Sequence, residues 1–461
     1  MSGRAPRIWV EVDDYLRNFD WSLTPTGIDR VQSEIFPHLA DLFPERVRFV
    51  RLGRDADEVA TVPSEKVNPV LEIGGFLQKY RALPGIIPVW RVARFLARRG
   101  ERLLGQLRRT SNRRRFERDV LPGDVLINIG ASWTHHDYAA TVAELKRRHG
   151  LRFALMVHDI LPVTHPQFVS PTHIPGFTKW LRSMADVVDM VLTPSVSSAV
   201  TFKEWATREG FAPTPVRPVP FGAGFGGMEG ESDGPPRARQ HVLYVSTIEV
   251  RKNHILLFRV WEQLIARHGA DKIPQLLFVG KYGWEIDALK AALAESRFLD
   301  GKIRVAQNVP DERLAECYRD AMFTVFPSFC EGWGLPVGES LRHGRYCIAS
   351  NATSIPEVGG KFVAYHQPGD TEEACRLVEQ ALFEPGYLDE MERRIREHYR
   401  PRGWDGTARA IVAEIDQDLA AASASFGAGR SAPQPQSPDR ADQQLLSDMG
   451  TLPSLKQHHR P

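Results

Sequence analysis

At 461 residues the chain is too long for one compact core, so we expect two domains with additional segments. Charged residues make up 25% of the chain and hydrophobic residues 42%, which is ordinary for a soluble globular enzyme. The net charge of +2 is near neutral, so the overall charge gives no indication of a nucleic-acid partner.

Cysteine use and the apolar runs bear on where the protein works. The four cysteines show no metal-ligand spacing and no C-x-x-C pair, which fits buried thiols in a reducing cytosol. The apolar run in MSGRAPRIWVEVDD is too short for a signal peptide, and no run approaches the ~18 apolar residues of a membrane span. We therefore expect a cytoplasmic protein whose contact with a membrane is at most peripheral.

The first predicted elements are a strand at 8–12, a helix after residue 28 and a strand at 46–52. The helix carries apolar residues at helical spacing, namely Val31, Ile35, Leu39 and Leu42. Between the first strand and this helix lies TPTGIDR, whose Gly27 lets the backbone approach a ligand closely. A plain helix-entry turn is the alternative interpretation.

A basic segment follows at 83–118. Eleven arginines stand among apolar residues between Trp90 and Arg118, which indicates a basic amphipathic helix of the kind that binds membrane surfaces. Gly100 and Gly105 weaken this prediction, because glycine destabilises helix interiors. The alternative is a solvated helix packed on the first domain by its apolar stripe. Nucleic-acid binding, the third interpretation, has no supporting motif.

The first domain continues with buried strands predicted within 123–130 and at 153–157 and 187–193, and with a helix at 195–207. The strand at 153–157 runs directly into His158-Asp159-Ile160-Leu161-Pro162. The carboxyl ends of strands in open α/β sheets face the ligand site, although a lone strand-end histidine is often structural. We expect this domain to end at residue 224.

A second domain begins after a Gly-, Pro- and charge-rich linker predicted at 225–239. The strand at 241–246 leads through TIEVRKN into a helix, so Arg251 and Lys252 stand at a strand-to-helix turn, where a pyrophosphate would bind. Further strands are predicted at 275–280 and 303–305, and the second of these is followed by Asn308-Val309-Pro310-Asp311.

The densest pattern is FPSFCEGWGLPVGESLRHG at 326–344. An apolar strand at 322–326 passes through a glycine loop into a helix that we expect to begin at Pro336 and to be capped by Gly344. Glu331, in the loop and free to point into a cleft, and Glu339, in the helix, flank a helix N-terminus that favours an anion. Ionised carboxylates accept hydrogen bonds from hydroxyl groups, so an anion site flanked by two carboxylates suits a nucleotide sugar.

Glu-x7-Glu filled with GWGLPVG, followed by IASN and SIPEVGG, closely resembles the retaining family 4 glycosyltransferases of the GT-B fold. The resemblance is strongest from His241 to Gly360 and is traceable back to Thr24. It implies an α/β protein with two Rossmann-like domains facing across a cleft and a C-terminal helix that returns to the first domain. The resulting boundaries are 1–224 for the acceptor domain, 240–405 for the nucleotide-sugar domain, 406–423 for the returning helix and 424–461 for a disordered tail.

The resemblance also implies roles for individual residues. Glu331 would hold the transferred sugar, Glu339 the ribose hydroxyls, and His158 the sugar or the acceptor hydroxyl. Lys252 would contact the donor diphosphate, and Arg251 would substitute for a family arginine that is absent here, where Ser246-Thr247 stands. The remaining donor-binding positions that it implies are Gly27, Val309, Gly334, Leu335 and Pro336.

The implied activity is transfer of a sugar from a nucleotide sugar to a glycan or lipid-linked acceptor in cell-surface polysaccharide synthesis, with retention of configuration, without a metal and without a cofactor. The TIEVRKNH and EGWGLP strings look like those of bacterial polysaccharide mannosyltransferases, so the expected donor is GDP-mannose. A GT-B sugar-nucleotide epimerase and a non-catalytic glycan-binding subunit are the alternatives. The expected location is the cytoplasm, at the inner face of the cytoplasmic membrane if the basic segment binds lipid.

Overall fold

The computed structural model describes residues 4–18, 27–53, 56–64, 67, 115–135, 137–224 and 239–428. The chain divides into compact units at Met1–Ile415 and Asp416–Pro461. Both β-sheets belong to the first unit. In the second unit the described residues, 416–428, continue one helix.

The first sheet has, among the described residues, seven strands in the order β3-β2-β1-β4-β5-β6-β7. All neighbours are parallel except β2 and β3. The central strand β4 reads VLIN and is buried throughout, as expected for a parallel strand covered on both faces. The strands are β1 (Ile8–Glu11), β2 (Val47–Leu52), β3 (Val59–Val62), β4 (Val125–Asn128), β5 (Arg152–Met156), β6 (Met190–Thr193) and β7 (Val216–Pro218).

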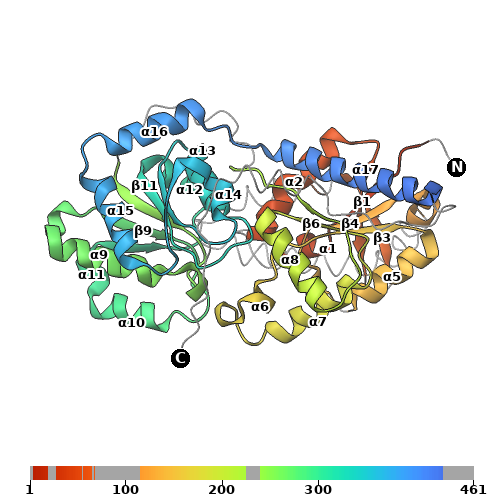
Figure 1. Ribbon diagram of the computed structural model, residues 1–461, viewed down its shortest axis with the longest axis horizontal. Coiled ribbons are helices and arrows are strands. Elements are labelled where there is room, and N and C mark those ends of the chain that lie inside the picture. The colour runs from red at the N-terminus through yellow and green to blue at the C-terminus, as the bar shows by residue number, and fades with distance from the viewer. Residues whose placement is uncertain are drawn as a thin grey trace, which may run out of the picture. The chain divides into compact units, whose positions relative to one another are not determined.

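Helices connect these strands and supply the apolar faces that cover the sheet (Figure 1). The start of α8 is typical, because Ser195 precedes it and its side chain accepts a hydrogen bond from the Ser198 N–H. The helices of this domain are α1 (Asp13–Asn18), α2 (Gly27–Leu42), η2 (Ser132–Thr134), α5 (Tyr138–His149), α6 (Leu161–Thr164), η3 (Pro166–Phe168), α7 (Ile174–Ala185) and α8 (Val196–Arg208).

The second sheet is parallel, and its described strands follow the order β10-β9-β8-β11-β12-β13. The order reverses beside β8, which is the point where ligands bind in open α/β sheets. The loops after β8 and β11, which carry Lys252 and Glu331, both leave from this point. The strands are β8 (His241–Val245), β9 (Gln275–Val279), β10 (Ile303–Ala306), β11 (Ala321–Phe326), β12 (Cys347–Ser350) and β13 (Val363–His366).

The helices of the second domain pack on both faces of its sheet. They are η5 (Val250–Lys252), α9 (His254–His268), η6 (Ala270–Lys272), α10 (Asp287–Glu295), α11 (Arg297–Gly301), α12 (Asp311–Asp320), α13 (Leu335–Arg342), α14 (Ile355–Gly359), η7 (Gly360–Phe362), α15 (Thr371–Phe383) and α16 (Tyr387–His398). The last helix, α17 (Trp404–Ala428), contacts the first domain instead: the Trp404 Nε1 donates to the Gly224 carbonyl and the Thr407 hydroxyl to the Pro220 carbonyl.

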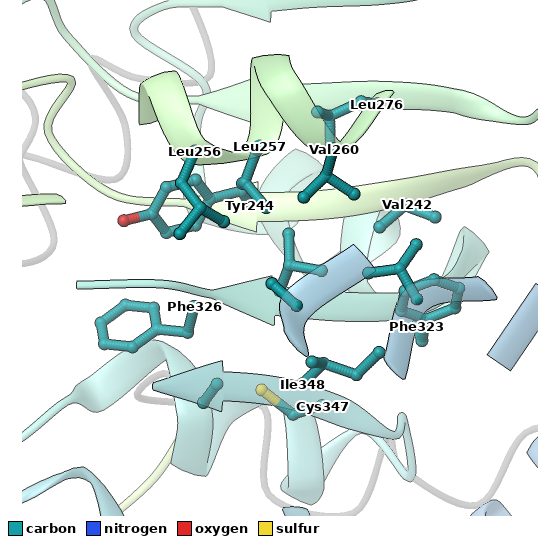
Figure 2. Packing of buried hydrophobic residues seen from close by; sticks show 14 of the residues in the cluster. Val242, Tyr244, Leu256, Leu257, Val260, Leu276, Phe323, Phe326, Cys347 and Ile348 are labelled. Carbon is teal, nitrogen blue, oxygen red and sulfur yellow. The ribbon is translucent and has the colours of Figure 1, made fainter. Parts of the chain in front are cut away.

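The core of the second domain lies between its sheet and α9, with α13 and α15 adding to it. Figure 2 shows Leu256, Leu257 and Val260 of α9 close to Tyr244 of β8. Each of these side chains is almost completely removed from water. Burial of such a side chain stabilises the fold by roughly 1.5–3 kcal/mol. A rigid core therefore supports the loops that leave β8 and β11.

The expected α/β architecture with two parallel-sheet domains is confirmed. Two short strands escaped prediction, β3 and β13. Both are edge strands of only four residues, and two or three residues of each are only half-buried. The helix expected at 406–423 is α17, which continues to Ala428 and so takes in the first residues of the expected tail.

Other expectations fall on residues that the structure does not describe. Of the basic segment 83–118 only residues 115–118 are described, and they are helical. The linker 225–239 is described at Arg239 alone. Within the described residues, every helix is too short or too polar to cross a membrane.

Candidate active site

The centre of the candidate site is the Glu331 carboxylate, which pairs with two cations. The Lys252 Nζ donates to Glu331 Oε1 at 2.5 Å, and the Arg251 Nη1 donates to Glu331 Oε2 at 2.8 Å. Burial alone raises the pKa of the Glu331 carboxyl, but the charges of Arg251 and Lys252 outweigh burial and lower that pKa to about 2. Glu331 is therefore ionised at all physiological pH values.

Glu331 is buried, with a relative exposure of 8%. A charged side chain of a loop can be buried here because two cations compensate its charge. The loop itself is tightly held. The side chains of Thr353 and Ser354 both donate to the Glu331 carbonyl, and the Arg251 guanidinium donates to the Cys330 carbonyl. A carboxylate held in this way is positioned in advance of any ligand.

The loop enters α13 through Gly334, whose φ of 115° lies in the left-handed region that favours glycine. The helix begins at Leu335, one residue earlier than expected, so Pro336 is its second residue and not its first. The helix ends at Arg342, and Gly344, with a φ of 67°, follows the cap residue His343. Residues 327–334, which connect β11 to α13 and carry Glu331, are called the glutamate loop below. The first backbone N–H groups of α13 thus stand at the end of the glutamate loop, as expected for an anion site.

Glu339 lies one turn into α13 and is held from two sides. The Tyr318 hydroxyl donates to its Oε2 at 2.7 Å, and the Arg30 Nη1 donates to its Oε1 at 3.0 Å. Arg30 also donates to Asp311 Oδ1 at 2.6 Å. Because Arg30 belongs to α2 and the two acids to the second domain, this cation joins the two domains. Each carboxylate oxygen has a second lone pair for a ribose hydroxyl.

His158 lies at the carboxyl end of β5, as expected, and is half-buried. Its Nε2 faces the Ile129 carbonyl at 2.8 Å. A carbonyl only accepts, so Nε2 carries the proton and Nδ1 is the acceptor nitrogen. Burial lowers the pKa of His158, and the nearby Asp159 and Asp14 only partly oppose that shift. The imidazole is therefore neutral at neutral pH, which suits it to bind a hydroxyl group.

The glutamate loop and His158 lie against each other although they belong to different domains. A Cβ added to Gly332 would stand 2.2 Å from the His158 carbonyl oxygen, so this contact requires glycine. The Ser195 hydroxyl, at the start of α8, donates to the Gly332 carbonyl at 2.9 Å. The structure thus brings together Glu331, Arg251 and Lys252 and sets their loop beside His158.

Two predicted residues are not placed in this cluster. Gly27 opens α2, and a Cβ added to it would have no heavy atom beyond its chain neighbours within 4 Å. The rest of its loop, 24–26, lies outside the described residues. Val309 is half-buried against the cluster formed by Leu314 and Tyr318. Its role towards a nucleotide base stays a prediction.

Some residues that build this region were not predicted. Arg30 and Tyr318 hold Glu339, and neither stands in a pattern that marks such a role. Glu11 and Asp14 form a buried acidic pair at the end of β1, where burial raises the pKa of both carboxyls. The run Glu-Val-Asp-Asp at the end of a predicted strand was the available signal.

Among the residues that the structure describes, no group of three or more His, Cys, Asp or Glu side chains is arranged to hold a metal ion.

A family model matches most of the second domain. Residues 231–400 match the family model described as glycosyl transferases group 1. The matched residues include the cluster of Glu331, Arg251 and Lys252, and also Glu339.

The chain is also similar to curated proteins. The chain is 36% identical to the O-antigen chain mannosyltransferase B of Escherichia coli over 149 residues, which are 32% of this chain and 38% of that protein. It is 29% identical to the serotype-specific mannosyltransferase WbdA of Escherichia coli over 279 residues, 57% of this chain and 34% of that protein. The matches thus span only about a third of the length of these relatives.

Solved structures extend the comparison to the whole fold. An α,α-trehalose-phosphate synthase from Burkholderia vietnamiensis matches with a TM-score of 0.55 at 14% identity, over 91% of this chain and 99% of that chain. The N-terminal domain of the Candida albicans trehalose-6-phosphate phosphatase matches with a TM-score of 0.53 at 12% identity, over 91% and 98%. The expected GT-B fold is confirmed.

Proposed function

We propose that the protein transfers a sugar from a nucleoside diphosphate sugar to a glycan acceptor in polysaccharide synthesis. The single observation that carries the proposal is the buried Glu331 carboxylate bound to both Lys252 and Arg251, in a group 1 glycosyltransferase domain. It combines a hydroxyl-binding carboxylate with two cations suited to a diphosphate. The mannosyltransferase relatives support mannose as the transferred sugar, and hence GDP-mannose as the donor.

In the proposed reaction the bond between the anomeric carbon and the β-phosphate oxygen breaks, and the electron pair stays on that oxygen. The acceptor hydroxyl oxygen bonds to the anomeric carbon, and its proton passes to the released diphosphate. Negative charge grows on the β-phosphate as the bond breaks, and Lys252, Arg251 and the N-terminus of α13 are placed to stabilise it. Glu331 accepts hydrogen bonds from hydroxyl groups of the sugar, and Glu339 accepts them from the ribose. His158 binds a hydroxyl group of the sugar or of the acceptor. We propose that configuration is retained.

We further propose that Arg251 and Lys252 stabilise the charge on the leaving diphosphate, so that transfer needs no divalent metal ion. Arg251 and Lys252 are both largely buried, so their charges act through a medium that screens them weakly. Transfer should then survive chelation. Activity that disappears in EDTA and returns with Mg²⁺ or Mn²⁺ would overturn this part of the proposal.

The test of the function is direct. The purified protein is screened against GDP-mannose, UDP-glucose, UDP-N-acetylglucosamine and their free diphosphates by thermal shift, because a ligand that binds the native state raises the melting temperature. The stabilising donor is then incubated with mannose-containing oligosaccharides, and products are identified by mass spectrometry. We expect an acceptor heavier by one sugar residue. No product with any donor, or conversion of the donor without an acceptor, contradicts the proposal.

The membrane is a separate proposal that rests on the sequence of residues 83–118. Cations near an anionic surface each contribute about 1 kcal/mol, and the effect falls with salt. We propose peripheral binding to anionic lipid, which would bring the enzyme to a lipid-linked acceptor. Co-sedimentation with phosphatidylglycerol vesicles at low and high salt tests it. Binding should weaken when Arg98, Arg99, Arg108 and Arg109 are changed to Glu, and a protein that stays in the supernatant at low salt contradicts it.

A further inference from the structure

Glu357 makes a contact between the two domains that the proposed reaction does not use. It belongs to α14 of the second domain, and its carboxylate lies at the start of α8 in the first domain. The backbone N–H of Val196 donates to Glu357 Oε2 at 2.7 Å, and that of Ser197 donates to Oε1 at 2.8 Å. Both oxygens are therefore engaged, each by a different residue of α8.

The chemistry of this contact is that of an anion on a helix N-terminus. The first N–H groups of a helix have no partner within the helix, and the helix dipole places partial positive charge there. At α8, which has 13 residues, the anion is a side chain of the other domain. Hydrogen bonds that involve a charged group are stronger than neutral ones, and here two act in parallel.

The contact lies close to the glutamate loop on both sides. Ser354, three residues before Glu357, donates to the carbonyls of Glu331 and Trp333. Ser195, which precedes α8, donates to the carbonyl of Gly332. The loop is thus held by the residues that lead into α14 and by the residue that leads into α8. Glu357 joins those two supports directly.

These contacts hold the glutamate loop very close to the backbone of His158. The Gly332 Cα is so close to the His158 carbonyl that an added Cβ would stand 2.2 Å from the oxygen. Ser198, whose N–H is bonded to Ser195, directs its own hydroxyl to the Gly332 carbonyl at 3.2 Å. A small movement of α8 relative to α14 would change the separation of Glu331 and His158.

We propose that Glu357 is a positioning residue: its carboxylate on the N-terminus of α8 holds the Glu331 loop in register with His158. The inference rests on the proposed function. Glu357 touches no reacting atom, so it acts through the relative placement of two groups that do. A misplacement of reacting groups by about 1 Å costs up to ~100-fold in rate.

The experiment compares Glu357→Gln with Glu357→Asp and with a matched control. Glutamine keeps the size of the side chain but turns an N–H₂ group towards one backbone donor. Aspartate keeps the charge but is shorter by one carbon. The control is Asp370→Asn, because the Asp370 carboxylate accepts from the Glu373 N–H at the start of α15, within one domain. It removes the same negative charge from a helix N-terminus without touching the coupling between the domains.

Three quantities are measured: kcat for sugar transfer, Kd for GDP by calorimetry, and hydrogen exchange of the amides in 196–198 and 331–334. For Glu357→Gln we expect kcat to fall by about 10- to 100-fold, Kd to stay within about twofold, and both segments to exchange faster. Glu357→Asp should lie between Glu357→Gln and wild type. Asp370→Asn should leave all three unchanged.

Several outcomes overturn the proposal. A wild-type kcat in Glu357→Gln does so, and so does a loss of kcat matched by an equal weakening of GDP binding, since that indicates general damage to the domain. Unchanged exchange in 331–334 also rejects the coupling. If wild-type protein transfers no sugar at all, the proposed function fails, while the exchange comparison still decides whether Glu357 couples the two segments.

Discussion

Arg30 and Glu339 stand 309 residues apart in the chain, yet the Arg30 Nη1 donates to Glu339 Oε1 at 3.0 Å. The same guanidinium reaches Asp311, so one cation of the first domain serves two acids of the second. Its exposure is only 14% and that of the Glu339 side chain 3%. A carboxylate this buried requires a partner, and Arg30 is the cation that supplies it.

Arg30→Ala should destabilise the fold by about 3 kcal/mol, the low end of the range for removing one partner of a buried ion pair, because Glu339 and Asp311 both lose charge compensation. Urea unfolding measures the change. Arg30→Ala combined with Glu339→Gln should be less destabilised than the sum of the two single changes. Strict additivity would show that the two side chains do not interact in solution.

The stability contributed by Glu331 should depend on pH below about 4.5. Its carboxyl has a folded-state pKa of about 2, below the ordinary value of 4.5, so its contribution is complete above pH 4.5 and is lost as the pH falls through 2. At ~1.4 kcal/mol per pKa unit the full contribution is about 3 kcal/mol. The difference in unfolding free energy between wild type and Glu331→Gln should shrink accordingly from pH 5 to pH 2. A difference that stays constant over this range contradicts the ion-pair assignment.

Glu331→Gln should also abolish sugar transfer, since an amide neither matches the two cations nor grips sugar hydroxyls as a carboxylate does. The variant must be compared with wild type below its own melting temperature, because burial of Glu331 makes some loss of stability certain. Turnover at the wild-type rate in the folded variant would remove Glu331 from the site.

Gly332→Ala should lower transfer strongly, because its methyl group would overlap the His158 carbonyl and force the loop away. Backbone atoms cannot move aside as a flexible side chain can. Gly176→Ala is the matched control: this glycine lies in α7, and an added Cβ there meets nothing within 4 Å. The control should keep wild-type activity. Equal activity in both variants would show that the approach of loop and histidine does not matter.

Lys252→Ala should weaken GDP binding by roughly 1.5–3 kcal/mol, the loss of one charge-assisted hydrogen bond. Titration calorimetry with GDP and UDP measures it. Lys290→Ala, at an exposed position on α10 of the same domain, controls for the general loss of one positive charge. Unchanged affinity for both nucleotides in Lys252→Ala counts against the diphosphate assignment.

The sequence predicted the local parts of the site well, because they depend on short-range patterns. The position of Glu331 between an apolar strand and a proline-led helix follows from residues within one stretch. So does the pairing of Arg251 with Lys252 at a strand-to-helix turn. The central strands were found for the same reason, since each is mostly apolar.

Contacts between distant segments were not predictable. Nothing near Arg30 in the sequence indicates Asp311, and nothing near Glu357 indicates the start of α8. The burial of Glu331 was missed because it results from the approach of the Arg251-Lys252 turn, which lies about eighty residues earlier. Such pairings arise when two loops leave neighbouring parallel strands, and sequence alone does not show which side chains then meet.

The pairing of Glu331 with Arg251 and Lys252 has a consequence for the speed of substrate capture. Glu249 also binds Arg251, so the two cations are already matched by two acids before any nucleotide arrives. A diphosphate approaching from solution is therefore attracted little by Arg251 and Lys252 at a distance and gains their attraction only when it exchanges partners at short range. These two cations should add little to its association rate or to the dependence of that rate on ionic strength, unlike the cations of an open basic surface.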